Sequence, residues 1–309
     1  MKAVSAEAVL LAGPTASGKS HAALALAERL NGMLVNADSM QVYREARILT
    51  ARPPDEDVWR APHLLYGHVS VREPYSVGRY QGDAERALQE VRGSGRVPIF
   101  VGGTGMYFGV LTDGIADIPP VPAALRARVA ARRKEIGAEA FHAALAVRDS
   151  ESASRLRIGD TQRVLRAYEV FEATGRPLSE WQKEIGKPLL AGLKLARFVL
   201  APPREQLYAS IDTRFDRMIE HGALEEAAAL GELDPGLPAS KILGLRELLA
   251  VSAGRISLED AKAAAKQATR QYAKRQLTWF RNRMREWHWI DRSDPAKIAD
   301  MLFVAVSEG

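Results

Sequence analysis

Short apolar runs alternate with longer amphipathic stretches through the first third of this 309-residue chain. The apolar runs are typical of buried strands, and the amphipathic stretches between them are typical of helices. The predicted strands lie at 8–12, 33–35 and 97–101, and the predicted helices at 18–30 and 76–93, the second with Ser76 as its N-cap. Strands that alternate with helices predict the α/β class, with a parallel sheet flanked by helices.

The pattern changes after the first third. Only helical signals occur from 119 to about 187, one of them opening at Asp160 and ending at Gly175. A strand pattern returns at 197–201, and the last third is helical, with a capping box at Ser257 that opens a helix reaching about residue 287. We therefore expect an α/β core formed by 1–112 and 194–309, and an all-helical insertion domain at 113–193.

Composition excludes several classes of protein. The chain has no cysteine, which rules out disulfides, thiolate zinc sites and a cysteine nucleophile, and which fits a reducing cytoplasm. No apolar run approaches the roughly 20 residues that span a bilayer, so we expect no membrane partner. The formal net charge of +5 favours a polyanionic partner only weakly, because many soluble proteins are mildly basic.

One segment matches the P-loop pattern in full, with a predicted strand before it and a predicted helix after it. Its backbone N–H groups can surround phosphate oxygens, the Lys19 ammonium adds a full positive charge, and the Ser20 hydroxyl can reach a Mg²⁺ ion. The segment is Gly13, Pro14, Thr15, Ala16, Ser17, Gly18, Lys19 and Ser20. The motif indicates a di- or triphosphate ligand but no particular reaction, and an NTP-dependent kinase is the default.

Polar residues follow the next two predicted strands. Asp38 and Ser39 come after the second strand, and Gly102–Gly105, with Thr104, after the third. The carboxyl ends of parallel strands share one edge, so these residues should meet the phosphate site. A carboxylate there can serve as a general base or support a Mg²⁺ ion. By itself, Asp38 is explained equally well as a turn-forming residue.

Seven segments, in order along the chain, resemble the tRNA dimethylallyltransferase family, also called tRNA isopentenyltransferases. Besides the P-loop they are 38–43, 102–107, 160–163, 214–218, 241–246 and 269–279. Two neighbours of expected RNA contacts differ from the family pattern. Thr161 stands where proline is common, and Leu245 where tyrosine is common.

The resemblance implies that the P-loop holds dimethylallyl diphosphate with Mg²⁺. The exocyclic amine of the adenine beside the anticodon would attack the allylic carbon and expel diphosphate. Asp38 would accept the amine proton, Thr104 would help to hold the extruded base, and Lys19, Ser20 and Arg214 would stabilise the leaving group. The implied tRNA contacts are Asp38, Ser39, Met40, Gln41, Thr104, Asp160, Thr161, Gln162, Arg163, Lys241, Gly244 and Arg246. We expect a monomer that binds the anticodon stem-loop.

Positive charge clusters in three places that suit RNA. Between 266 and 285 the chain has seven basic residues and no acidic one, and Arg270, Lys274, Arg281 and Arg285 would share one helical stripe. A solvated basic face would explain this run alone, and two further clusters in the insertion favour tRNA. The second cluster is Arg126, Arg128, Arg132, Arg133 and Lys134, and the third is Arg157, Arg163 and Arg166.

Three alternatives remain open at this stage. A P-loop small-molecule kinase explains 13–20 but not the basic helix. An adenylate isopentenyltransferase shares the chemistry but acts on free nucleotide, for which the long insertion has no purpose. A non-enzymatic, nucleotide-regulated RNA-binding module leaves Asp38 without a task.

Overall fold

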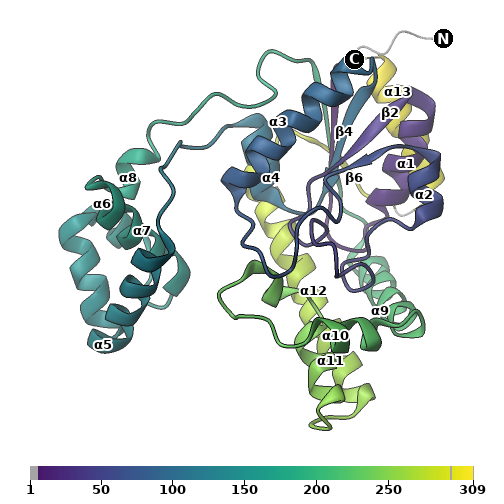
Figure 1. Ribbon diagram of the computed structural model, residues 1–309. Coiled ribbons are helices and arrows are strands. Elements are labelled where there is room, and N and C mark those ends of the chain that lie inside the picture. Colours follow the sequence, from purple (N-terminus) through teal and green to yellow (C-terminus); the bar gives the residue numbers. More distant parts are fainter. Residues whose placement is uncertain (1–5, 293, 309) are drawn as a thin grey trace. The chain divides into compact units, whose positions relative to one another are not determined.

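A computed structural model describes residues 6–292 and 294–308 of the chain. Within them, six strands form one sheet in the order β3-β2-β4-β1-β5-β6, and every neighbouring pair is parallel (Figure 1). The strands are β1 Ala8–Ala12, β2 Gly32–Asn36, β3 His63–Leu64, β4 Val97–Gly102, β5 Leu195–Leu200 and β6 His288–Ile290. The predicted α/β fold with a parallel sheet is confirmed.

Helices cover both faces of this sheet (Figure 1). On one face, α1 (Lys19–Leu30) packs beside α13 (Pro295–Glu308), and the two bury leucine, isoleucine and valine side chains against β1, β4 and β5. On the other face lie α3 (Val77–Gly93) and α4 (Gly105–Thr112). Because both faces are covered, the central strands are almost entirely apolar, as expected for a parallel sheet.

The helix α2 (Asp55–Arg60) packs beside α1, where Arg60 pairs with Glu28. The remaining helices of the core lie towards the carboxyl edge of the sheet. They are α9 (Arg204–Glu220), α10 (Ala223–Leu230), the 3₁₀ turn η1 (Pro238–Lys241), α11 (Leu245–Ser252) and α12 (Leu258–Arg283). Two predicted helix starts are confirmed by their hydrogen bonds. Ser76 Oγ accepts from Arg79 N at 3.1 Å, and Ser257 Oγ accepts from Asp260 N at 3.1 Å.

The described chain divides into two compact units, one formed by 1–108 with 192–309 and the other by 109–191. The second unit consists of α5 (Ala123–Arg148), α6 (Ser150–Arg155), α7 (Thr161–Thr174) and α8 (Leu178–Trp181) around Phe141, Leu145 and Tyr168. Asp149 ties this bundle together, since its carboxylate accepts from Ser152 N, Ser179 N and Ser179 Oγ at 2.6–3.0 Å.

Two details of the sequence-based prediction are wrong. The last third is not wholly helical, because α12 ends at Arg283 and β6 follows it to pair with β5. The two-residue strand β3 was not predicted. The helix predicted to open at Asp160 and end at Gly175 is confirmed as α7, although the Asp160 side chain pairs with Arg163 and caps no backbone group. None of the described helices is long and apolar enough to cross a membrane.

Candidate active site

The P-loop joins β1 to α1 and wraps around the first turn of that helix. Gly18, with φ of 83°, occupies the left-handed region, which glycine adopts without steric cost. Ser17 is buried, and its hydroxyl has no hydrogen-bond partner among the described residues. A concave loop with an unpartnered hydroxyl, at the positive end of a helix, is built for an anion.

Lys19 carries its charge into this loop from the first residue of α1. Its side chain is only 8% exposed, and Nζ donates to Pro14 O at 3.2 Å. Burial lowers the pKa of Lys19 to about 8, an effect that Asp38 opposes and Arg214 reinforces. The protonated ammonium is therefore poorly stabilised without an anion, and a phosphate group would supply the missing negative charge.

Asp38 follows β2 and is held by its own turn. Its backbone N–H donates to Asn36 Oδ1 at 2.9 Å, and its Oδ1 accepts from Met40 N at 2.9 Å. The turn-forming role considered for this residue is thus real. The carboxylate of Asp38 nevertheless lies near the phosphate loop. Its negative charge raises the pKa of both Lys19 and Arg214.

Thr104 connects the ends of β2 and β4. Its Oγ1 accepts from Ser39 N at 2.9 Å and donates to Ser39 Oγ at 3.2 Å. The structure therefore brings Asp38, Ser39 and Thr104 to the edge of the sheet that also carries Lys19, as the strand pattern predicted.

Arg214 enters the same region from α9. Burial lowers the pKa of this guanidinium, and Asp38 partly offsets the effect. The pKa of Lys19 responds to both Arg214 and Asp38, and the pKa of Arg214 responds to Asp38. Two cations beside a single anion leave net positive charge, which suits a ligand with several negative charges.

Three tyrosines near Asp38 escaped the sequence-based prediction. Burial, and secondarily the Asp38 carboxylate, raises the pKa of Tyr66, Tyr107 and Tyr272. Tyr107 also stacks on Tyr80 with ring centroids 3.7 Å apart. Tyr107 and Tyr272 lie in motif segments, but only the fold shows that residues so distant in sequence face one carboxylate.

The residues expected to bind tRNA lie in both units. In the core unit, Lys241 and Arg246 are exposed on either side of Gly244, whereas Gln41 donates to Thr50 O and Ala51 O at 3.0 and 2.7 Å. In the helical unit, Arg126, Gln162 and Arg163 are exposed, and Thr161 Oγ1 accepts from Arg133 at 2.9 Å.

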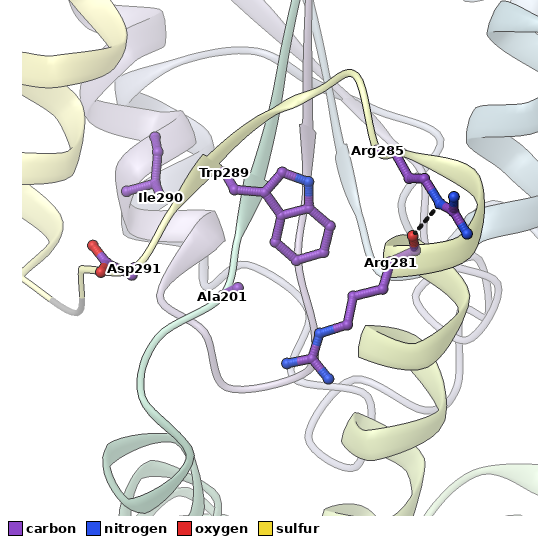
Figure 2. A pocket seen from close by; sticks show the side chains of 6 residues that line it. All are labelled: Ala201, Arg281, Arg285, Trp289, Ile290 and Asp291. Carbon is purple, nitrogen blue, oxygen red and sulfur yellow. Dashed lines mark hydrogen bonds between the residues drawn. The ribbon is translucent and has the colours of Figure 1, made fainter.

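The basic stripe of α12 is less uniform than predicted. Lys274 and Arg281 are exposed, but Arg270 is ion-paired with Asp212 of α9 and lies over the ring of Tyr208. Arg285 lies beyond the helix end. Figure 2 shows the region after α12, where a cavity of about 410 Å³ is lined by Ala201, Arg281, Arg285, Trp289, Ile290 and Asp291.

The chain offers few ligands for a metal ion. Among the described residues, no group of three or more His, Asp or Glu side chains could hold a cation by itself. The exposed Ser20 at the start of α1 supplies one hydroxyl oxygen next to the phosphate loop. Such a donor set fits a hard cation that takes most of its ligands from phosphate oxygens and water, as Mg²⁺ does.

Comparisons with known sequences agree on one family. The IPP transferase family matches residues 41–283 of this chain. The chain is 53% identical over 282 residues to the tRNA dimethylallyltransferase of Parvibaculum lavamentivorans, covering 91% of this chain and 89% of that protein. It is 52% identical over 289 residues to the enzyme of the same name from Rhodospirillum centenum, covering 93% and 92%.

Solved structures point the same way. A tRNA isopentenylpyrophosphate transferase from Bacillus halodurans is similar over 98% of this chain and 97% of its own, with a TM-score of 0.66 and 32% identity. A eukaryotic dimethylallyltransferase, described as acting on tRNA, is similar over 94% of this chain and 75% of its own, with a TM-score of 0.80 and 27% identity.

Proposed function

The chain belongs to the IPP transferase family, and from that premise we propose that it prenylates tRNA. The reaction is transfer of the dimethylallyl group from dimethylallyl diphosphate to N6 of the adenine on the 3′ side of the anticodon, with release of diphosphate. The prenylation of tRNA follows from relatives about 50% identical over nearly the whole chain. The donor, the target atom and the roles of individual residues rest on the site.

One observation carries these finer assignments: a phosphate loop that faces a carboxylate. Lys19 and Arg214 provide two cations for a diphosphate, and Asp38 stands close enough to influence the pKa of both. The phosphate loop alone would serve a kinase equally well. Alkylation of an amine needs, in addition, a group that accepts the amine proton, and the Asp38 carboxylate would lie beside the leaving group to do so.

The proposed step conserves atoms and electrons. The lone pair of the adenine N6 forms a bond to C1 of the allyl group, and the C1–O bond breaks with its electron pair going to diphosphate. The nitrogen then carries an excess proton, which passes to a carboxylate oxygen of Asp38. Lys19 and Arg214 stabilise the charge that grows on the departing oxygens, a contribution of about 3 kcal/mol for one well-placed donor.

Mg²⁺, when bound, would neutralise charge on the diphosphate. Ser20 would hold it, with the diphosphate and water as further ligands. Thr104 would position the extruded adenine, because its hydroxyl is fixed by Ser39 next to Asp38. We expect the protein to act as a monomer in the cytoplasm.

Each unit exposes cations that would meet tRNA phosphates. In the core unit these are Lys274 and Arg281 on α12 and Arg246 on α11, and Lys241 at the end of η1 is exposed as well. In the helical unit, Arg126 and Arg163 are exposed. So many exposed cations suit a folded stem-loop and exceed what a free nucleotide requires.

The test uses purified protein, Mg²⁺, dimethylallyl diphosphate and an unmodified anticodon stem-loop, without ATP. We expect diphosphate release and a mass gain of C₅H₈ on the RNA. A stem-loop with guanine in place of the target adenine is the matched control and should stay unmodified. Prenylation of AMP in preference to the stem-loop would favour an adenylate isopentenyltransferase, and phosphorylation of an acceptor from ATP would favour a kinase.

A further inference from the structure

Gln276 joins the phosphate loop to the loop that carries Thr104. It lies on α12 and is only 6% exposed. Its Oε1 accepts from Thr15 N at 3.0 Å, and its Nε2 donates to Gly103 O at 2.9 Å. One buried amide, 261 residues from Thr15 and 173 residues from Gly103 along the chain, therefore connects the loop after β1 to the loop after β4.

An amide fits both partners at every pH. The Thr15 N–H needs an acceptor and the Gly103 carbonyl needs a donor, and Gln offers both without a titratable group. An ionised carboxylate would accept but could not donate. Since both loop groups are buried with Gln276, losing either bond would leave a polar group unsatisfied.

Position 103 shows how close this contact is. A Cβ there would lie 2.2 Å from Gln276 Nε2 and 3.2 Å from Asp38 Oδ2, so only glycine leaves space for the amide. Gln276 is thus a near neighbour of the Asp38 carboxylate. Gln276 therefore contacts the phosphate loop through Thr15, and through Gly103 it contacts the segment beside Asp38, the proposed proton acceptor.

Other contacts of α12 support the same arrangement. Ala273 is buried with Leu207 and Ile211 of α9, and Ala16 of the phosphate loop packs against this cluster. Tyr272, one turn before Gln276, is hydrogen-bonded to Thr104. The face of α12 that carries Tyr272, Ala273 and Gln276 therefore holds both loops, whereas Lys274 and Arg281 remain exposed.

We propose that Gln276 is a positioning residue that sets the spacing between the diphosphate cradle and the loop of Asp38 and Thr104. This inference rests on the proposed function. The Thr15 N–H belongs to the phosphate loop but donates to Gln276 and not to the ligand. This hydrogen bond fixes the loop so that its other backbone N–H groups can face the ligand. The residue should govern use of the prenyl donor and leave tRNA affinity unchanged, because the exposed cations of α12 are not involved.

The first test is Gln276→Glu, assayed by kcat/KM for dimethylallyl diphosphate at several pH values and divided by the wild-type value at each pH. A neutral glutamic acid can accept from Thr15 and donate to Gly103, but its ionised form cannot donate. The positive charges of Lys19 and Arg214 favour the ionised form at this position, whereas burial and the Asp38 carboxylate oppose it; the phenol of Tyr272, whose pKa is raised, stays neutral at these pH values and adds no charge. We expect a loss of about 10-fold to 100-fold near pH 8, and a smaller loss as the pH falls towards about 6.

Two further variants make the result specific. Gln276→Met keeps the length but has no titratable group, so it should lose about as much donor kcat/KM at every pH. Gln267→Glu introduces the same charge at an exposed site on the same helix and should behave as wild type. Stem-loop affinity should be unchanged in all three variants, and thermal unfolding checks that each is folded.

The inference is overturned if folded Gln276→Met keeps wild-type kcat/KM for the donor, or if stem-loop affinity falls as much as donor use. It is also overturned if the relative activity of folded Gln276→Glu does not depend on pH. Should Gln276→Glu fail to fold, Gln276→Met alone decides. Absence of prenyl transfer by the wild-type protein would instead contradict the proposed function.

Discussion

Replacing Lys19 with methionine should stabilise the empty protein while it removes activity. The pKa of Lys19 is lowered from the ordinary 10.5 to about 8, mainly by burial. At 1.36 kcal/mol per pH unit, this difference means that holding the charged ammonium in the folded state costs about 3 kcal/mol. Methionine has a similar length and no charge, but it gives up the hydrogen bond to Pro14 O, worth about 1 kcal/mol. The expected net gain in the free energy of unfolding is about 2 kcal/mol at pH 7.

The sign depends on pH in a defined way. Lys19 is protonated in both folded and unfolded chains below about pH 8, so the full cost is present there. Between about 8 and 10.5 the folded protein releases its proton first, and the cost declines as the pH rises. The advantage of Lys19→Met should therefore be largest at neutral pH and should shrink over this interval.

Urea unfolding of the two proteins, without ligand and in the same buffers, measures this difference. Exposed Lys194 provides the control, because Lys194→Met should change the free energy of unfolding little. Prenyl transfer by Lys19→Met should fall about 100-fold to 1000-fold through loss of leaving-group stabilisation. If ligand-free Lys19→Met is less stable than wild type at pH 7, the buried ammonium is not a cost, and the reasoning from its environment fails.

Three other outcomes follow from the same site and surfaces. Asp38→Asn should slow single-turnover prenyl transfer about 100-fold to 10,000-fold with stem-loop affinity unchanged, and near-normal chemistry would exclude Asp38 as the proton acceptor. Lys274→Gln should make the slope of log stem-loop affinity against log salt concentration shallower by up to about one unit. Arg270→Gln should change this slope less, because Arg270 is already ion-paired with Asp212, and equal changes in the two variants would show that both residues contact phosphates. Glu226→Ala should lower the free energy of unfolding by about 1–3 kcal/mol in urea, since its carboxylate accepts three backbone N–H groups at 2.8 Å, and an equal loss in exposed Glu225→Ala would contradict that assignment.

Local sequence determined much of this protein. A few consecutive residues around the P-loop segment 13–20 are enough to predict a strand, a phosphate-binding loop and the start of a helix. The caps Ser76 and Ser257 are equally local, because each hydroxyl bonds to a backbone group three residues on. These features were predicted correctly since no distant residue is needed to form them.

Tertiary structure alone decided the features that depend on residues far apart in the chain. The three residues of β6 form a strand only because β5 offers them a parallel edge. Arg270 looks like its neighbours on α12 until Asp212 of α9 pairs with it. Gln276 is one glutamine in a polar helix, and its task appears only where Thr15 and Gly103 meet it. A periodic pattern reports which face of an element is apolar, but a hydrogen bond or an ion pair between elements depends on the folded arrangement of both partners.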